Sequence, residues 1–204
     1  MTPDEALNRL IEGNKRYIDD APALGEVSRK RRLEIAKGQN PFATLVGCSD
    51  SRVGPEQLFG VGLGDLFIVR TAGNNVDSLG MGSIEFAVSQ LKTPLIVVLG
   101  HEKCGAVDTA IKAVHNDIQL PGSMGKLIEP IIPSVLSAQR KHGCECAHDK
   151  LLEESVRENV RRMVNRLRTA SEPILMEPQA SGALKIVGAY YDLESGLVDF
   201  FDKN

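Results

Sequence analysis

The sequence FATLVGCSDSR, residues 42–52, places a short apolar run directly before a cysteine and two charged side chains. The run from Phe42 to Gly47 is rich in branched apolar residues without polar alternation, which is typical of a strand buried on both faces. Residues 66–70 and 95–99 have the same character. Because such strands are typical of parallel sheets, the sequence predicts an α/β fold with a mainly parallel central sheet.

Helical patterns lie on both sides of these strands. The first helix is expected to start after Thr2, since Pro3 and Glu5 complete a capping box, and a second is expected over residues 28–37. Apolar side chains at helical spacing predict further helices near residues 84–91, 104–115 and 150–170. Residues 184–191 and 197–201 flank a turn at 193–196, which predicts an antiparallel edge strand. We therefore expect one domain over residues 1–204, with residues 1–38 as an extended N-terminal helical arm among the flanking helices.

Composition excludes several classes of partner. The 204 residues carry a net charge of −3, and with no tryptophan and 4% aromatic residues they offer neither a basic surface nor a base-stacking platform for nucleic acid. The longest apolar run is far too short to cross a membrane. The first residues lack the apolar core of a signal peptide, so we expect a cytoplasmic protein, or a periplasmic one if a signal peptide has been removed.

Cys48 and His101 each follow a predicted strand, and Cys104 stands three residues after His101. In open α/β sheets, ligands bind at the carboxyl ends of the strands, so neighbouring strands would bring these side chains into one crevice. Two thiolates and an imidazole suit zinc, and three protein ligands leave a fourth position for water or substrate. The sequence predicts one catalytic zinc ion per chain.

Asp50 and Arg52 extend this site. In an extended segment alternate residues share a side, so Cys48, Asp50 and Arg52 are expected to converge. The arginine would keep Asp50 ionised, and Asp50 would then either accept a hydrogen bond from zinc-activated water or ligate the metal itself. Two thiolates also neutralise the charge of zinc, so we predict weaker acidification of water than by zinc on three histidines, and activity that rises toward alkaline pH.

These motifs resemble the β-class carbonic anhydrases. CSDSR at residues 48–52, HEKCG at residues 101–105, and the stretches 64–70, 72–74 and 188–191 carry the resemblance over nearly the whole chain. The family implies reversible hydration of carbon dioxide to bicarbonate and a proton by attack of zinc-bound hydroxide, with Cys48, His101 and Cys104 as ligands. It also implies an Asp50–Arg52 catalytic pair and a homodimer or homotetramer in which the N-terminal arm packs on the partner.

The resemblance further assigns a substrate pocket, formed by Gln39 from the neighbouring subunit together with Phe67, Ala72, Phe86 and Gly105. Gly105 would offer a backbone N–H near the substrate. One branch of the family has a tryptophan three residues before the first zinc cysteine, in an inhibitory bicarbonate pocket. This chain has Leu45 there, which argues against a pocket of that form.

Two other functions remain open at this point. The same scaffold in relatives hydrolyses carbon disulfide or carbonyl sulfide, and a non-catalytic structural or regulatory zinc protein would use Asp50 as a permanent fourth ligand. A second cluster of metal-binding residue types, His142, Cys144, Cys146 and His148, is interpreted as a polar loop, with a second metal site or a redox pair of Cys144 and Cys146 as alternatives.

Overall fold

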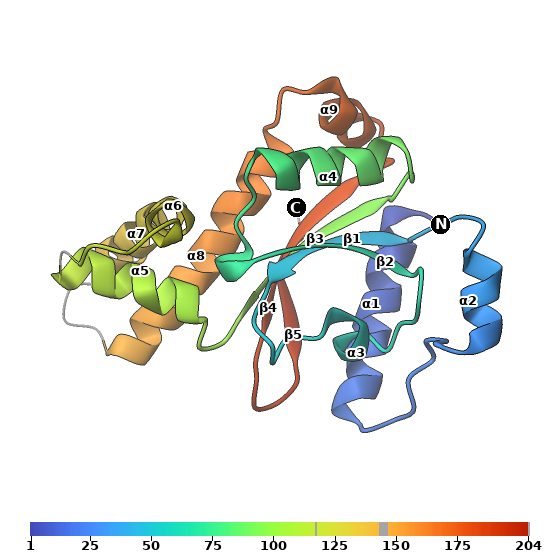
Figure 1. Cartoon of the computed structure of the whole chain (residues 1–204), viewed down its shortest axis with the longest axis horizontal. Helices are drawn as coiled ribbons and strands as arrows, with labels where there is room; N and C mark the ends of the chain where they lie inside the picture. The colour runs from blue at the N-terminus through green and yellow to red at the C-terminus, as the bar shows by residue number, and fades with distance from the viewer. Residues whose placement is uncertain (117, 143–146, 204) are drawn as a thin grey trace.

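A five-stranded sheet forms the centre of the computed structural model, which describes residues 1–116, 118–142 and 147–203 (Figure 1). The strand order is β2-β1-β3-β4-β5. The first four strands run parallel and β5 is antiparallel to β4, as the sequence predicts. The strands are β1 (Ala43–Cys48), β2 (Leu66–Thr71), β3 (Leu95–His101), β4 (Lys185–Tyr191) and β5 (Val198–Asp202).

The helices alternate with the parallel strands before a long helical segment that precedes β4. They are α1 (Pro3–Ile18), α2 (Arg29–Ile35), α3 (Pro55–Leu58), α4 (Ser78–Ser89), α5 (Gly105–Asn116), α6 (Met124–Ile128), α7 (Ile132–His142), α8 (His148–Arg168) and α9 (Pro173–Ala180). Two 3₁₀ turns, Ala72–Asn74 and Glu129–Ile131, complete the described elements.

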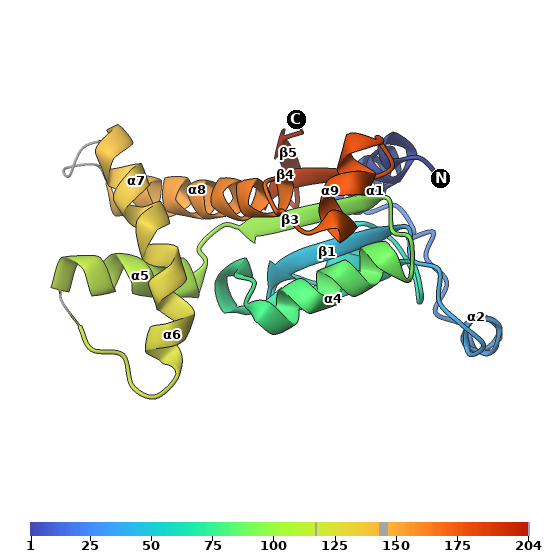
Figure 2. The ribbon, with the colours of Figure 1, turned by 90° about the horizontal axis from the view of Figure 1, so that it is seen from above.

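Helices cover both faces of the sheet. Side chains of α1 and α3 share a buried apolar cluster with one face, and those of α4, α8 and α9 share another with the opposite face. A third cluster joins α5, α7 and the first half of α8 at the carboxyl end of the parallel strands, which Figure 2 shows as a separate group of helices. Side chains at the carboxyl ends of the strands, where ligands bind in folds of this kind, therefore have α5, α7 and α8 on one side.

The strands differ in burial. Every residue of β1 and β3 is buried, which confirms the prediction for these two runs. The expectation that residues 66–70 are buried on both faces is wrong, because Leu66, Phe67 and Ile68 are only partly buried and Arg70 is exposed. The physical reason is position: β2 lies at the edge of the sheet, so one side of the strand has no neighbour within the described chain.

The N-terminal segment splits into two parts. Helix α1 begins with the predicted capping box of Thr2 and Glu5, and its Leu7 and Leu10 are buried in this chain's own core. Helix α2, capped by Ser28, has no buried residue and stands clear of the sheet in Figure 2. Packing of the N-terminal arm, residues 1–38, on a partner subunit stays a prediction. Within this arm, α2 is the part that projects from the sheet.

None of the helices described is both long and apolar enough to span a membrane. The cluster of His142, Cys144, Cys146 and His148 falls largely outside the described residues. Within them, His148 Nε2 lies 2.9 Å from Asp108 Oδ1.

Candidate metal centre

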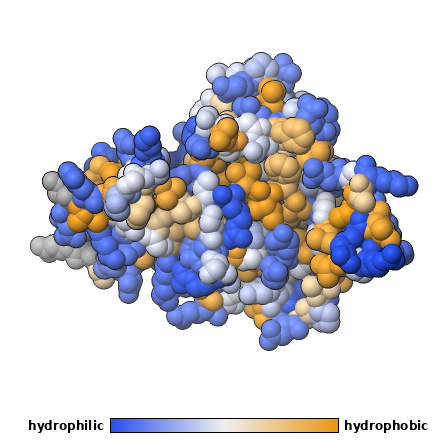
Figure 3. Space-filling view, in the orientation of Figure 1, coloured by the Kyte–Doolittle hydropathy of each residue, from blue (hydrophilic) through white to orange (hydrophobic). Residues whose placement is uncertain are grey.

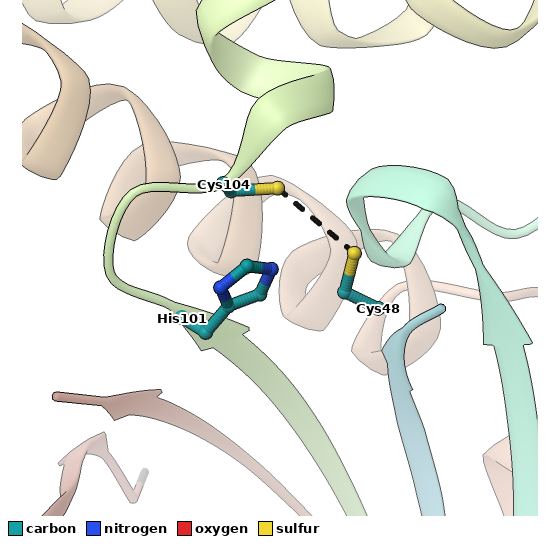
Figure 4. A group of neighbouring side chains, drawn as sticks. All are labelled: Cys48, His101 and Cys104. Atoms are coloured by element: carbon teal, nitrogen blue, oxygen red, sulfur yellow. Dashed lines mark hydrogen bonds between the residues drawn. The ribbon is translucent and has the colours of Figure 1, made fainter. Parts of the chain in front are cut away.

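The carboxyl ends of β1 and β3 bring three metal-binding side chains together. Cys48 is the last residue of β1, His101 is the last of β3, and Cys104 directly precedes α5. Their ligand atoms all lie within 4.8 Å of one another, and the three side chains face one another in Figure 4. All three are buried, with exposed fractions of 4%, 0% and 1%. These residues can hold a metal ion.

The imidazole of His101 leaves one nitrogen for a metal. Its Nδ1 lies 2.8 Å from the carbonyl oxygen of Glu102, and because a carbonyl only accepts, Nδ1 carries the proton. The lone pair is then on Nε2, which is buried without a hydrogen-bond partner among the described residues. A buried polar atom without a partner is costly, and metal coordination at this nitrogen would remove that cost.

The two cysteine sulfurs are hydrogen-bond partners. Their Sγ atoms lie 4.0 Å apart. The pKa of the Cys48 thiol is lowered, first because the Cys104 S–H donates to it and then because the backbone N–H groups of Gly73 and Asp50 stabilise the thiolate. The pKa of Cys104 is raised by its contact with Cys48 and by burial. One thiolate is thus already favoured, and a bound cation would favour the second.

The donor set and spacing fit zinc. Two sulfurs at the usual zinc–sulfur length on a tetrahedral ion would stand about 3.8 Å apart, close to the observed separation. Two thiolates and one imidazole nitrogen match the Cys₂His ligand set of catalytic zinc sites. The group formed by Cys48, His101 and Cys104 does not include Asp50.

Asp50 lies beside the three ligands but is held by Arg52. The guanidinium donates from Nε to Oδ1 at 2.9 Å and from Nη2 to Oδ2 at 2.7 Å. Oδ2 is 3.8 Å from His101 Nε2, so the carboxylate borders the ligands without being released from the arginine. The side-chain hydrogen bonds from Arg52 hold the pKa of Asp50 well below its usual range, and the carboxylate stays ionised.

The convergence of Asp50 and Arg52 has another cause than the one expected from alternation in an extended segment. The chain turns after Asp50: the backbone N–H of Arg52 donates to Asp50 Oδ1 at 2.9 Å, and that of Val53 donates to the Asp50 carbonyl at 3.1 Å. An aspartate that accepts from the amide two residues later forms its own turn. Arg52 Nη2 also donates to the carbonyl of Lys103, which ties this turn to the segment before Cys104.

Two further residues, Arg70 and Gly73, hold Cys48 by hydrogen bonds that the sequence motifs do not predict. Arg70 on β2 donates to the carbonyl of Cys48, the last residue of β1, and to those of Asp50 and Val53 in the segment that follows, at 2.8–2.9 Å. The backbone N–H of Gly73 donates to Cys48 Sγ at 3.3 Å. Arg70 and Gly73 fall in the stretches that carry the family resemblance, but residue type alone does not show what they contact.

Only some of the residues expected to line the substrate pocket lie near the three metal-binding side chains. Phe67 on β2 and Phe86 on α4 pair at 6.3 Å between ring centroids, and Ala72 precedes Gly73 at the end of β2. Gly105 is exposed at the start of α5. Gln39 is exposed, and no hydrogen bond within the described chain joins it to the ligands. Leu45 is fully buried in the core.

Comparison with known proteins gives one consistent family. The sequence model of carbonic anhydrase matches residues 43–198. Carbonic anhydrase 2 of Mycobacterium tuberculosis is 44% identical over 195 residues, covering 95% of this chain and 90% of that protein. The carbonic anhydrase of Mycolicibacterium smegmatis is 38% identical over 197 residues, covering 97% of this chain and 92% of that protein.

Solved structures show the same fold. A tetrameric β-carbonic anhydrase of the ascomycete Sordaria macrospora aligns with a TM-score of 0.76 at 23% identity, over 97% of this chain and 94% of that one. The Coccomyxa β-carbonic anhydrase in complex with acetazolamide aligns with a TM-score of 0.70 at 28% identity, over 96% of this chain and 86% of that one.

Proposed function

This chain belongs to the β-class carbonic anhydrases and is an enzyme of that class, and we propose that it hydrates carbon dioxide reversibly with one zinc ion held by Cys48, His101 and Cys104. The observation that carries the zinc assignment is His101 Nε2, which is buried without a partner and stands beside two thiol sulfurs. Zinc at these ligands would supply a Lewis acid that lowers the pKa of water and so makes it a stronger nucleophile.

We assign Asp50 the task of orienting the attacking water. Its carboxylate is ionised, is fixed by two hydrogen bonds from Arg52, and has Oδ2 on the side of His101 Nε2. A carboxylate in this state accepts a hydrogen bond from water and directs the oxygen lone pair toward carbon dioxide. Hydration of carbon dioxide releases a proton from the attacking water. Because Arg52 keeps the pKa of Asp50 low, Asp50 does not retain this proton, which passes to solvent.

The aromatic pair of Phe67 and Phe86 supports an apolar side of the pocket, which suits a nonpolar substrate such as carbon dioxide. Ala72 and Gly105 lie at the carboxyl end of the strands, next to the metal ligands, whereas Phe67 stands four residues before that end of β2, opposite Thr44. We assign the Gly105 N–H to substrate, and exposed Gln39 to the pocket of a neighbouring subunit.

Carbon dioxide hydration followed by stopped flow tests this function directly, beside sulfide release from carbon disulfide and carbonyl sulfide. We expect hydration that scales with the zinc content of the sample. A hydration rate at background in a zinc-loaded sample would contradict the proposal, and sulfide release in that same sample would assign the site to the sulfur substrates.

The pH profile separates the proposed roles of the metal and of Asp50. Two thiolate ligands would reduce the positive charge of a bound zinc ion and its power to acidify water, so hydration should rise from neutral toward alkaline pH. Asp50 is already ionised at neutral pH because Arg52 lowers its pKa. Asp50→Asn should therefore lower the whole profile without changing its shape. A flat wild-type profile at constant zinc content, or a variant whose rise is lost, would contradict this assignment.

We also infer that the chain assembles as a homodimer or a larger homo-oligomer. Apolar side chains gather over α4 and the neighbouring β2 edge in Figure 3, where Leu79 is 80% exposed and Phe86 48% exposed. Strand β2 is an edge of the sheet, and exposed edges and apolar patches of this kind commonly lie in interfaces. The Sordaria macrospora relatives are described as tetrameric.

Sedimentation velocity should show a dimer or tetramer, and Leu79→Asp should shift the population toward smaller species because it places a charge on the α4 face. Leu136→Asp is the matched control, since Leu136 is 43% exposed on α7 at the other end of the molecule. A wild-type monomer would contradict the assembly. Equal dissociation by both variants would contradict its placement on α4.

A further inference from the structure

A chain of buried polar groups leads from α8 to the sulfur of Cys48. We infer that Asn159, in the middle of α8, is a positioning residue for Cys48 and acts on it through the backbone of Gly73. The inference rests on the proposed function, because it takes Cys48 as a metal ligand. Asn159 itself touches neither the ligand atoms nor the substrate pocket.

Both the nitrogen and the oxygen of the Asn159 side-chain amide form hydrogen bonds. The side chain is 3% exposed, and its Nδ2 donates to the carbonyl oxygen of Gly73 at 2.9 Å. Its Oδ1 accepts from the hydroxyl of Ser134, which is fully buried on α7, at 3.3 Å. A buried amide with partners at both ends has one orientation that satisfies them, so Asn159 holds the Gly73 carbonyl in a fixed direction.

Gly73 needs such a support. Its φ is +74°, in the left-handed region, and a Cβ there would stand 2.8 Å from Ile131 Cδ1 and 3.1 Å from Ala106 Cβ. Only glycine fits that conformation and space, but glycine also restrains φ and ψ least of all residues. The direction of its N–H therefore depends on the contacts made by the neighbouring peptide groups. The Asn159 bond to the Gly73 carbonyl is one of those contacts.

The Gly73 N–H is the group that reaches the site, since it donates to Cys48 Sγ at 3.3 Å. A hydrogen bond to a ligating thiolate withdraws electron density from the sulfur and fixes its orientation, and outer partners of this kind tune metal affinity and electronics. Asn159 would in this way keep Cys48 aimed at His101 and Cys104 and keep its sulfur a weaker electron donor to the metal.

Helix α8 supplies its own control position. Ser155 lies four residues before Asn159, one helical turn away, and is also fully buried. Its Oγ has no hydrogen-bond partner within the described chain. A buried polar side chain on this helix is thus not by itself connected to Cys48, and Ser155→Ala tests α8 without touching the Asn159 contacts.

Asn159→Leu removes the amide while keeping a side chain of similar size. With cobalt(II) as the probe ion, we expect the thiolate-to-cobalt absorption band of this variant to shift from that of the wild type. We also expect zinc affinity, measured by competition with a chromophoric chelator, to fall about 10- to 100-fold, as for other outer partners of metal ligands. Ser155→Ala should change neither quantity. Ser134→Ala, which leaves Asn159 its bond to Gly73, should shift both less than Asn159→Leu and in the same direction.

The outcomes are distinguishable. An Asn159→Leu protein with the wild-type band and zinc affinity, but a lower midpoint of thermal unfolding, would make Asn159 a purely structural residue and overturn the inference. If that variant does not fold, Ser134→Ala decides: a shifted band supports the inference and an unchanged band overturns it. If the wild-type chain binds neither cobalt nor zinc, the proposed function falls and this inference falls with it.

Discussion

Replacing Asp50 with asparagine should lower the turnover number for carbon dioxide hydration about 10- to 100-fold while leaving one zinc ion per chain. Asparagine has nearly the same shape, but its amide NH₂ cannot accept a hydrogen bond and it carries no charge to pair with Arg52. The water that Asp50 orients would lose its fixed acceptor. The three proposed metal ligands would keep their contacts, because Asp50 is held by Arg52 and is not among them.

Stopped-flow hydration and zinc content measured on the same Asp50→Asn sample check this expectation. Ser51→Ala is the matched control, since Ser51 is exposed and adjacent in the same turn. Loss of zinc from Asp50→Asn would instead make Asp50 the fourth ligand of a structural site. Full turnover in the variant would remove the orienting role assigned to the Asp50–Arg52 pair.

Replacing Cys48 with serine should abolish both zinc binding and hydration. The serine hydroxyl remains protonated at neutral pH and is a poor zinc ligand, so only His101 and Cys104 would remain as ligands at this site. The loss should exceed that of Asp50→Asn, because the variant removes the metal and with it the source of the nucleophile. Zinc per chain and the hydration rate should fall together to background.

Cys144→Ser controls for removal of any thiol, and its position lies outside the described residues. It should retain zinc and full activity. A Cys48→Ser protein that keeps one zinc ion per chain would place the ion elsewhere and contradict the assignment of the site. Circular dichroism of both variants distinguishes loss of the metal from loss of the fold.

Sequence patterns were sufficient where one local property decides the structure. The uninterrupted apolar runs of β1 and β3 match strands that are wholly buried, and the Thr2 capping box and the turn before β5 are fixed by neighbouring residues. The prediction that β2 is buried on both faces is wrong, because the order of strands in a sheet depends on long-range packing that an apolar run does not encode.

The metal centre shows the same division. Cys48, His101 and Cys104 can be placed together because their spacing puts two of them at the ends of parallel strands. The bonds from Arg70 to Cys48 and to the segment after it, and the path from Asn159 through Gly73, could not be derived. They join residues 17–22 and 86 positions apart, and both depend on backbone carbonyls that every residue carries. Residue type gives no signal for such contacts.

The central claim is that one zinc ion at Cys48, His101 and Cys104 makes this chain an active carbonic anhydrase. Its most direct test is titration of the metal-free chain with zinc while carbon dioxide hydration is measured on each sample. The account predicts a rate near background without metal, a linear increase with added zinc, and a plateau at one equivalent per chain. Full hydration by the metal-free chain, or a zinc-saturated chain that stays at background, would contradict it.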